Sequence, residues 1–264
     1  MLQHSIIKFS TPVLACALLF SSCLKNLDTK PQTIHTDIND FNDLTAVQAG
    51  AYGDLQNPKY YGGSGGAAMA WSSLPDIMGD DFIEAYESLG DWENASRWVY
   101  AADDPIISGA FTQAYVVISA ANNVIQNCKG YESGSTIASA FQLEAQARAL
   151  RAHCHFDLLR YYAQSYTRNS DSLGVPYITI FSPDDPLSAK PSRISVKKCY
   201  DSIYNDLNSA LAIYRQYGDV SNPNRFFIDS TCIHAMLARI GLYNGQYDQA
   251  AADATIVIGK IPLA

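Results

Sequence analysis

The sequence contains no run of basic residues and has fewer positive than negative charges. Its 264 residues include 18 lysines and arginines against 26 aspartates and glutamates, which gives a formal net charge of -8. Attraction between basic side chains and phosphate dominates nucleic-acid binding, and anionic lipid surfaces attract basic segments in the same way. The composition therefore argues against a nucleic-acid-binding protein and against attachment to anionic lipid through charge.

The apolar run near the start of the chain is short. Val13–Phe20 is uninterrupted, but a helix that crosses a bilayer needs roughly 20 apolar residues. Lys8 precedes this run, and the small residues Ser21 and Ser22 follow it. A positive charge, an apolar core and a small-residue cleavage site, in this order, are typical of a secretory signal. We therefore expect residues 1–22 to be a signal peptide.

Cys23 follows the two serines directly, and this arrangement resembles the cleavage box of bacterial lipoproteins. The resemblance implies cleavage before Cys23, thioether lipidation of its sulfur and acylation of the new amino group. Several acyl chains anchor a protein firmly, because each buried methylene contributes roughly 0.8 kcal/mol of membrane affinity. The alternative is an ordinary secretory signal with an incidental cysteine. Residues 23–40 show no sustained period, and we expect them to form an extended tether.

The remaining cysteines are Cys128, Cys154, Cys199 and Cys232. Their spacings are wide and irregular, so the sequence leaves all three disulfide pairings open. Three of the four lie within helical apolar patterns, and this placement favours buried free thiols.

Apolar residues recur every three or four positions through most of the chain from residue 41 onward, and no strong strand pattern is present. This period predicts an all-α body built from antiparallel helix pairs with long aromatic-rich loops. Asn39 or Asp40 can cap the first helix and Ser195 a later one, whereas Gly130 is expected to end a helix. The expected helices cover about 41–55, 74–83, 105–129, 136–163, 196–214, 231–243 and 248–259.

The last two predicted helices have the clearest local signature. Gly245, Tyr247 and Ala250 match the turn and the start of the second helix of a tetratricopeptide repeat. The small residues Ala238 and Gly241 allow the two helices to approach closely. The fold is therefore expected to be tetratricopeptide-like.

Aromatic residues are concentrated in the loop-rich stretch 58–105, which contains all three tryptophans. Sugar recognition uses flat rings against the apolar faces of pyranoses, and Trp and Tyr combine such a ring with a polar group. Loops on a rigid scaffold often carry binding residues. The alternative is that the rings fill the core beneath the loops. The candidate ligand-binding residues are Trp71, Trp92, Trp98 and Tyr100.

Other polar clusters have structural explanations. His153 and His155 are two apart on a predicted helix and point about 200° apart, so they are not expected to share a metal ion. Adjacent acids usually diverge, and glycoside hydrolysis needs two acids at a defined separation. We therefore expect no catalytic residue, no metal and no cofactor. The adjacent acids are Asp80-Asp81, Asp103-Asp104 and Asp184-Asp185.

Several motifs together resemble the SusD/RagB family of outer-membrane nutrient-binding lipoproteins. Each is weak alone, but their order extends from about residue 20 to residue 260. Besides the cleavage box and the repeat-like pair, they are Val47–Tyr52, Leu74–Asp81, Tyr115–Asn123, Glu144–Arg160, Gly174–Tyr177, Ser192-Arg193 and Tyr200–Leu211.

The resemblance implies a non-enzymatic, lipid-anchored protein exposed on the outer membrane. It implies capture of oligosaccharide, or in some members peptide, and delivery to a SusC-like TonB-dependent transporter. The family usually continues well past this point, so residues 41–264 are expected to be a helical domain that is incomplete at its C-terminus. The alternative function is a helical-repeat scaffold of the cell envelope without a small-molecule ligand.

Overall fold

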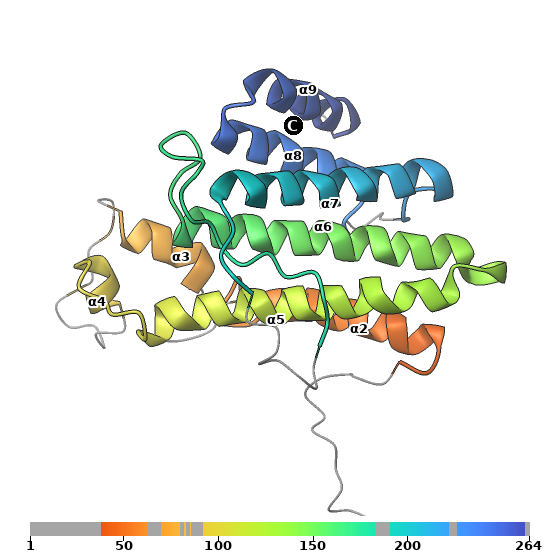
Figure 1. Ribbon diagram of the computed structural model, residues 1–264, viewed down its shortest axis with the longest axis horizontal. Helices are drawn as coiled ribbons and strands as arrows, with labels where there is room; N and C mark the ends of the chain where they lie inside the picture. Colours follow the sequence, from red (N-terminus) through yellow and green to blue (C-terminus); the bar gives the residue numbers. More distant parts are fainter. Residues whose placement is uncertain are drawn as a thin grey trace, which may run out of the picture. The chain divides into compact units, whose positions relative to one another are not determined.

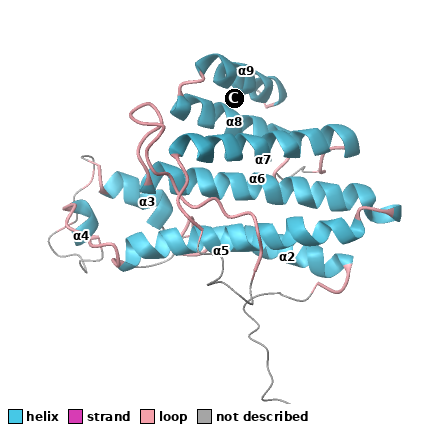
Figure 2. Cartoon of the chain, in the orientation of Figure 1, coloured by secondary structure: helices cyan, strands magenta, loops and turns pink. Residues whose placement is uncertain are grey.

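Helices form nearly all the regular structure in the computed structural model, which describes residues 38–62, 70–79, 82, 85, 92–182, 191–221 and 226–261. Within these residues there is no strand beyond an isolated bridge between Leu173 and Ser195. The fold class predicted from the apolar period is thus confirmed (Figure 2). The predicted signal peptide, Cys23 and most of the predicted tether lie outside the described residues. No helix of the described part is long and apolar enough to cross a membrane.

The longer helices match the expected positions closely. They are α2 Phe41–Leu55, α5 Pro105–Cys128, α6 Ile137–Tyr162, α7 Val196–Tyr217, α8 Ser230–Asn244 and α9 Tyr247–Lys260. Two shorter helices, α3 Ala70–Ile77 and α4 Glu93–Ser96, lie between α2 and α5. One expected range was wrong, because the helix α3 lies earlier than predicted. The helix α5 ends at Cys128 with Lys129 as its C-cap, so Gly130 follows its end as expected and lies in the 3-10 turn Lys129–Tyr131.

Successive long helices pack side by side. In the unit that comprises Asp37–Ala264, α2 packs on α5, α5 on α6, α6 on α7, and α8 on α9 (Figure 1). Short polar side chains cap the helix starts by accepting backbone N–H groups that have no helical partner. Asp40 accepts from the N–H of Asp43, and Ser195 from that of Lys198.

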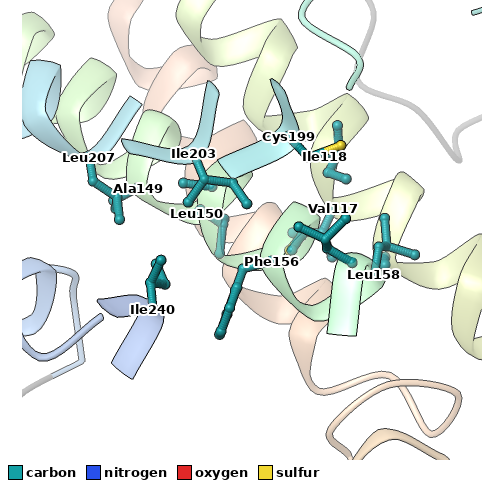
Figure 3. Packing of buried hydrophobic residues seen from close by; sticks show 14 of the residues in the cluster. Val117, Ile118, Ala149, Leu150, Phe156, Leu158, Cys199, Ile203, Leu207 and Ile240 are labelled. Atoms are coloured by element: carbon teal, nitrogen blue, oxygen red, sulfur yellow. The ribbon is translucent and has the colours of Figure 1, made fainter. Parts of the chain in front are cut away.

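The core lies between α5, α6, α7 and α8, and α6 is buried on nearly all sides. Figure 3 shows Leu150 of α6 among Val117 and Ile118 of α5, Ile203 of α7 and Ile240 of α8. A helix that is apolar around most of its circumference needs neighbours on several sides, which explains its central place. Three of the free thiols, those of Cys128, Cys154 and Cys199, are buried, and Cys232 is partly buried.

A buried ion pair joins α6 to α7. Arg151 donates to both carboxylate oxygens of Asp206, with Nη2–Oδ1 and Nε–Oδ2 distances of 2.5 and 2.8 Å. Its third donor group, Nη1, lies 2.8 Å from Oδ1 of Asn122 on α5. The hydroxyl of Tyr177 donates to Asp206 over 2.6 Å. The ion pair therefore connects three helices and, through Asp206, the segment that carries Tyr177.

Residues 174–182, here called the crossing segment, form no helix or strand and lie along α5, where their contacts extend from Tyr115 to Gln126 and where His155 of α6 also holds them. The Nε2 atom of His155 accepts from the N–H of Ile178 over 3.1 Å, and its Nδ1 donates to the carbonyl of Arg151 over 2.9 Å. The imidazole also stacks on Tyr177, with ring centroids 3.8 Å apart. Burial lowers the pKa of His155 from 6.5 to about 3, so the ring is neutral in the folded protein.

The helices α8 and α9 are in close contact at Gly241. If Gly241 carried a Cβ atom, that atom would lie only 2.9 Å from Cβ of Ala250 and 3.2 Å from the carbonyl oxygen of Gln246. Between them, Gly245 adopts a left-handed conformation with φ of 81° at the end of α8. These contacts explain the small residues that the sequence places in this pair.

We expect Gly241→Ala to lower the free energy of unfolding by about 1–3 kcal/mol, because the added methyl group forces α8 and α9 apart. Gly50→Ala is the matched control, since a Cβ atom on Gly50 in α2 has no neighbour within 4 Å. That control should raise the free energy of unfolding by up to about 1 kcal/mol through helix propensity. Urea unfolding of both variants checks this. If the two variants change the free energy of unfolding by the same amount, the close contact between α8 and α9 at Gly241 is contradicted.

We expect stability to fall as the pH drops below 6.5, because His155 stays neutral when folded and is protonated when unfolded. The contribution lost by pH 5 is about 2 kcal/mol. In His155→Gln, whose amide can keep both hydrogen bonds, the loss between pH 7 and pH 5 should be smaller by about that amount. Urea unfolding at several pH values measures both slopes. Parallel slopes would rule out His155 as the titrating group.

Candidate ligand-binding site

Trp98 lies at the end of α4 in a conformation that is unusual for a large side chain. Its N–H donates to the carbonyl of Ala95, and the N–H of Val99 donates to that of Asn94, with N–O distances of 3.1 and 3.0 Å. This pair of bonds is a Schellman motif, in which glycine usually takes the position that Trp98 occupies. Trp98 has a φ of 57° and is the one described non-glycine residue with positive φ.

The ring of Trp98 is both exposed and held in place. Its side chain is 63% exposed, and its Nε1 donates to the carbonyl of Met78 over 3.0 Å. A left-handed backbone at a bulky residue costs on the order of 1 kcal/mol, and such strain is often found at functional sites. An indole that is fixed by a hydrogen bond and turned to solvent is suited to stacking on a ligand.

Trp98 and Tyr100 border a cavity of about 350 Å³. Their ring centroids are 6.4 Å apart. The other walls come from the end of α3, the start of α5 and the end of α6, so helices support a site that the α4 loop completes. These walls are formed by Leu74, Pro75, Met78, Gly79, Ile107, Arg160, Tyr161 and Tyr162.

Among the described residues of the lining, Arg160 is the one with a charged side chain, and it is already paired. Its Nη2 lies 2.5 Å from Oδ1 of the fully buried Asp157. Asp157 also accepts hydrogen bonds from the hydroxyls of Tyr60 and Tyr61. The guanidinium carbon of Arg160 lies 5.1 Å from the ring centroid of Tyr161. Because its charge is balanced within the protein, the cavity offers mainly rings and aliphatic groups.

Two of the four candidate residues therefore come together at this cavity, and two do not line it. Trp71 is only 3% exposed, and its ring packs edge-on against Tyr60 and Tyr161 at centroid distances of 5.0 and 4.7 Å. Trp71 therefore packs in the core against Tyr161, as in the alternative interpretation that the aromatic rings fill the core beneath the loops. Trp92 is partly buried and packs against the main core.

The cavity also contains residues that the sequence reasoning missed. Arg160, Tyr161 and Tyr162 end α6, and Met78 follows α3. The adjacent tyrosines at a helix end, next to a long loop, were the available signal.

His153 and His155 diverge as expected: His153 lies 3.3 Å from the hydroxyl of Tyr61, whereas His155 binds Ile178.

Comparison with known proteins identifies the family of this protein. A model of the SusD-like family, described as starch-binding and associating with the outer membrane, matches residues 26–242. The chain therefore belongs to the SusD-like family. Its relation to the SusD/RagB proteins, expected from the sequence motifs, is confirmed.

Particular relatives are similar over most of this chain. SusD-like protein P2 of Formosa agariphila is 24% identical over 220 residues, which cover 83% of this chain and 39% of the relative. The crystal structure of a putative sugar-binding protein from Bacteroides vulgatus is 26% identical, with a TM-score of 0.72, over 85% of this chain and 47% of that one. A SusD superfamily protein from Bacteroides thetaiotaomicron is also 26% identical, with a TM-score of 0.68, over 82% and 45%. The chain thus spans less than half the length of these relatives.

We expect Trp98→Gly to be more stable than Trp98→Ala by about 1 kcal/mol. Both variants lose the ring and its hydrogen bond to Met78, but only glycine adopts the left-handed conformation without steric cost. Urea unfolding of the two variants measures the difference directly. If alanine proves equal to or better than glycine, the left-handed conformation of residue 98 is wrong.

Proposed function

We propose that this protein is a cell-surface lipoprotein that binds oligosaccharide at the Trp98 cavity and passes it to a TonB-dependent outer-membrane transporter. The observation that carries the proposal is the exposed, hydrogen-bonded indole of Trp98 beside Tyr100 at the mouth of an aromatic cavity. Membership in a family described as starch-binding supports the ligand class.

The cavity suits the chemistry of a neutral sugar. Its volume of about 350 Å³ falls within the range of small-molecule sites, which have mostly apolar walls with a few polar groups. Pyranose rings present apolar C–H faces that stack on indole and phenol rings, while hydroxyls hydrogen-bond at the ring edges. The pairing of Arg160 with Asp157 leaves no free charge in the described lining. Binding needs no covalent step, so we propose a binding protein without enzymatic activity.

The proposed location follows from the start of the chain. Cleavage before Cys23 and its lipidation would anchor the protein in the outer membrane, and residues 23–40 would serve as a tether. The description of the family as associating with the outer membrane supports this placement. Peptide is the alternative ligand class for the same cavity.

An envelope scaffold without a small-molecule ligand is the second candidate function. It is favoured by apolar side chains exposed on the last helix pair, where Leu242, Tyr247 and Ile258 are 58, 63 and 50% exposed. Exposed apolar patches often mark contacts with other proteins. Direct ligand binding separates the two candidates.

Isothermal titration with glucan oligosaccharides of the starch and laminarin types, and with peptides, tests the proposal. We expect binding of at least one glycan and a loss of at least tenfold in affinity in Trp98→Gly, which is about 1.4 kcal/mol. Tyr247→Ala is the matched control, because Tyr247 is equally exposed but does not line the cavity. Its affinity should be unchanged. Absence of heat with every glycan would remove the oligosaccharide proposal, and heat with peptides alone would select the other ligand class.

A further inference from the structure

A second cavity, of about 290 Å³, lies between α5 and the crossing segment. Tyr115, Ile118 and Ser119 line it from α5, and Tyr177, Thr179 and Ile180 line it from the crossing segment. None of the four candidate ligand-binding residues is among the residues that line this cavity.

The two cavities lie along one side of α5. Ile107 lines the first cavity, and Tyr115 and Ile118 line the second. At 100° per residue, Tyr115 is rotated about 80° from Ile107 around the helix axis and Ile118 about 20°. At 1.5 Å per residue, they lie about 12 and 16 Å further along it. The two cavities are thus on the same side of α5 and further apart than one sugar ring extends.

Aromatic rings connect the two cavities. Phe111 lies between Ile107 and Tyr115 on α5 and is partly exposed. Its ring centroid is 5.0 Å from that of Tyr162, which lines the first cavity, and 5.0 Å from that of Tyr115, which lines the second. Tyr162, Phe111 and Tyr115 therefore form a row of rings that links one cavity to the other.

The walls of the second cavity are held in place by internal hydrogen bonds. The hydroxyl of Tyr115 donates to the carbonyl of Pro176 over 2.8 Å, and the amide of Asn122 donates to that of Ile178 over 3.0 Å. Together with the His155 contact, these bonds fix the crossing segment against α5. A site that is already formed loses little conformational entropy on binding.

The lining of the second cavity also fits a neutral sugar. It combines the rings of Tyr115 and Tyr177 with the hydroxyl side chains of Ser119 and Thr179, and its described lining includes no charged residue. Ser119 and Thr179 are exposed, so their hydroxyls are accessible to a ligand. This combination of rings and hydroxyls matches that expected for the apolar faces and hydroxyl groups of a saccharide.

We infer that the two cavities are subsites for a single linear, neutral oligosaccharide, which extends along α5 over the row of rings. This inference rests on the proposed function and adds a minimum ligand length to it. A ligand that fills both subsites gains affinity because its second contact is intramolecular. Only an oligosaccharide of several units reaches from one cavity to the other.

Titration with a series of oligosaccharides of one linkage, from disaccharide to octasaccharide, tests the inference. We expect weak binding of the shortest members and an increase of at least tenfold once the chain reaches both cavities. Ser119→Arg fills the second cavity, and we expect it to reduce the affinity of long chains to that of short ones while short-chain affinity stays the same. The matched control is Val116→Arg, because Val116 is exposed on α5 but lines neither cavity.

The outcomes separate this inference from the proposed function. If affinity does not depend on chain length, or if Ser119→Arg weakens short and long chains equally, the second subsite is wrong although glycan binding at the Trp98 cavity stands. If the wild-type protein binds no member of any series, both fail. Thr179→Arg, at an exposed position of the crossing segment, repeats the test with no change to α5 in case Ser119→Arg does not fold.

Discussion

The buried ion pair between Arg151 and Asp206 is the interaction that joins the walls of the second cavity to the helical core. It joins α6 to α7 and reaches α5 through Asn122 and the crossing segment through Tyr177. Because the desolvation of two charges offsets much of their attraction, such a pair adds little net stability, yet loss of one partner leaves a costly unpaired charge. Here its hydrogen bonds hold four segments together. Two of these segments, α5 and the crossing segment, line the second cavity.

Much of the helical scaffold could be predicted from the sequence, because the signals for it are local. The apolar spacing of α5 and α6 and the caps at Asp40 and Ser195 depend on residues within a few positions of one another. The burial of Tyr60 could not be predicted, since its hydroxyl binds Asp157 from 97 positions away. The path of the crossing segment likewise depends on contacts between residues far apart in the sequence.

The candidate site was predicted in part for the same reason. The composition of the stretch 58–105 made the three tryptophans candidate ligand-binding residues. Their actual roles depend on tertiary contacts that composition does not encode. Trp71 is buried against Tyr161, whereas Trp98 is exposed and has a left-handed backbone. No propensity scale predicts that conformation for tryptophan. The walls at the end of α6 were missed because their rings belong to the last turn of a helix that is otherwise buried.

The buried free thiols provide natural probes of local unfolding, because each can react only when the helices around it separate. Cys128 lies in the cluster between α2, α5 and α6, whereas Cys154 and Cys199 lie in the main core. Burial raises the pKa of all three thiols, so they are protonated as well as covered in the folded state. Alkylating reagents reach each of them only when its surroundings separate. Reaction rates at the natural cysteines therefore distinguish the opening of the α2 layer from that of the central helices, without any engineered label.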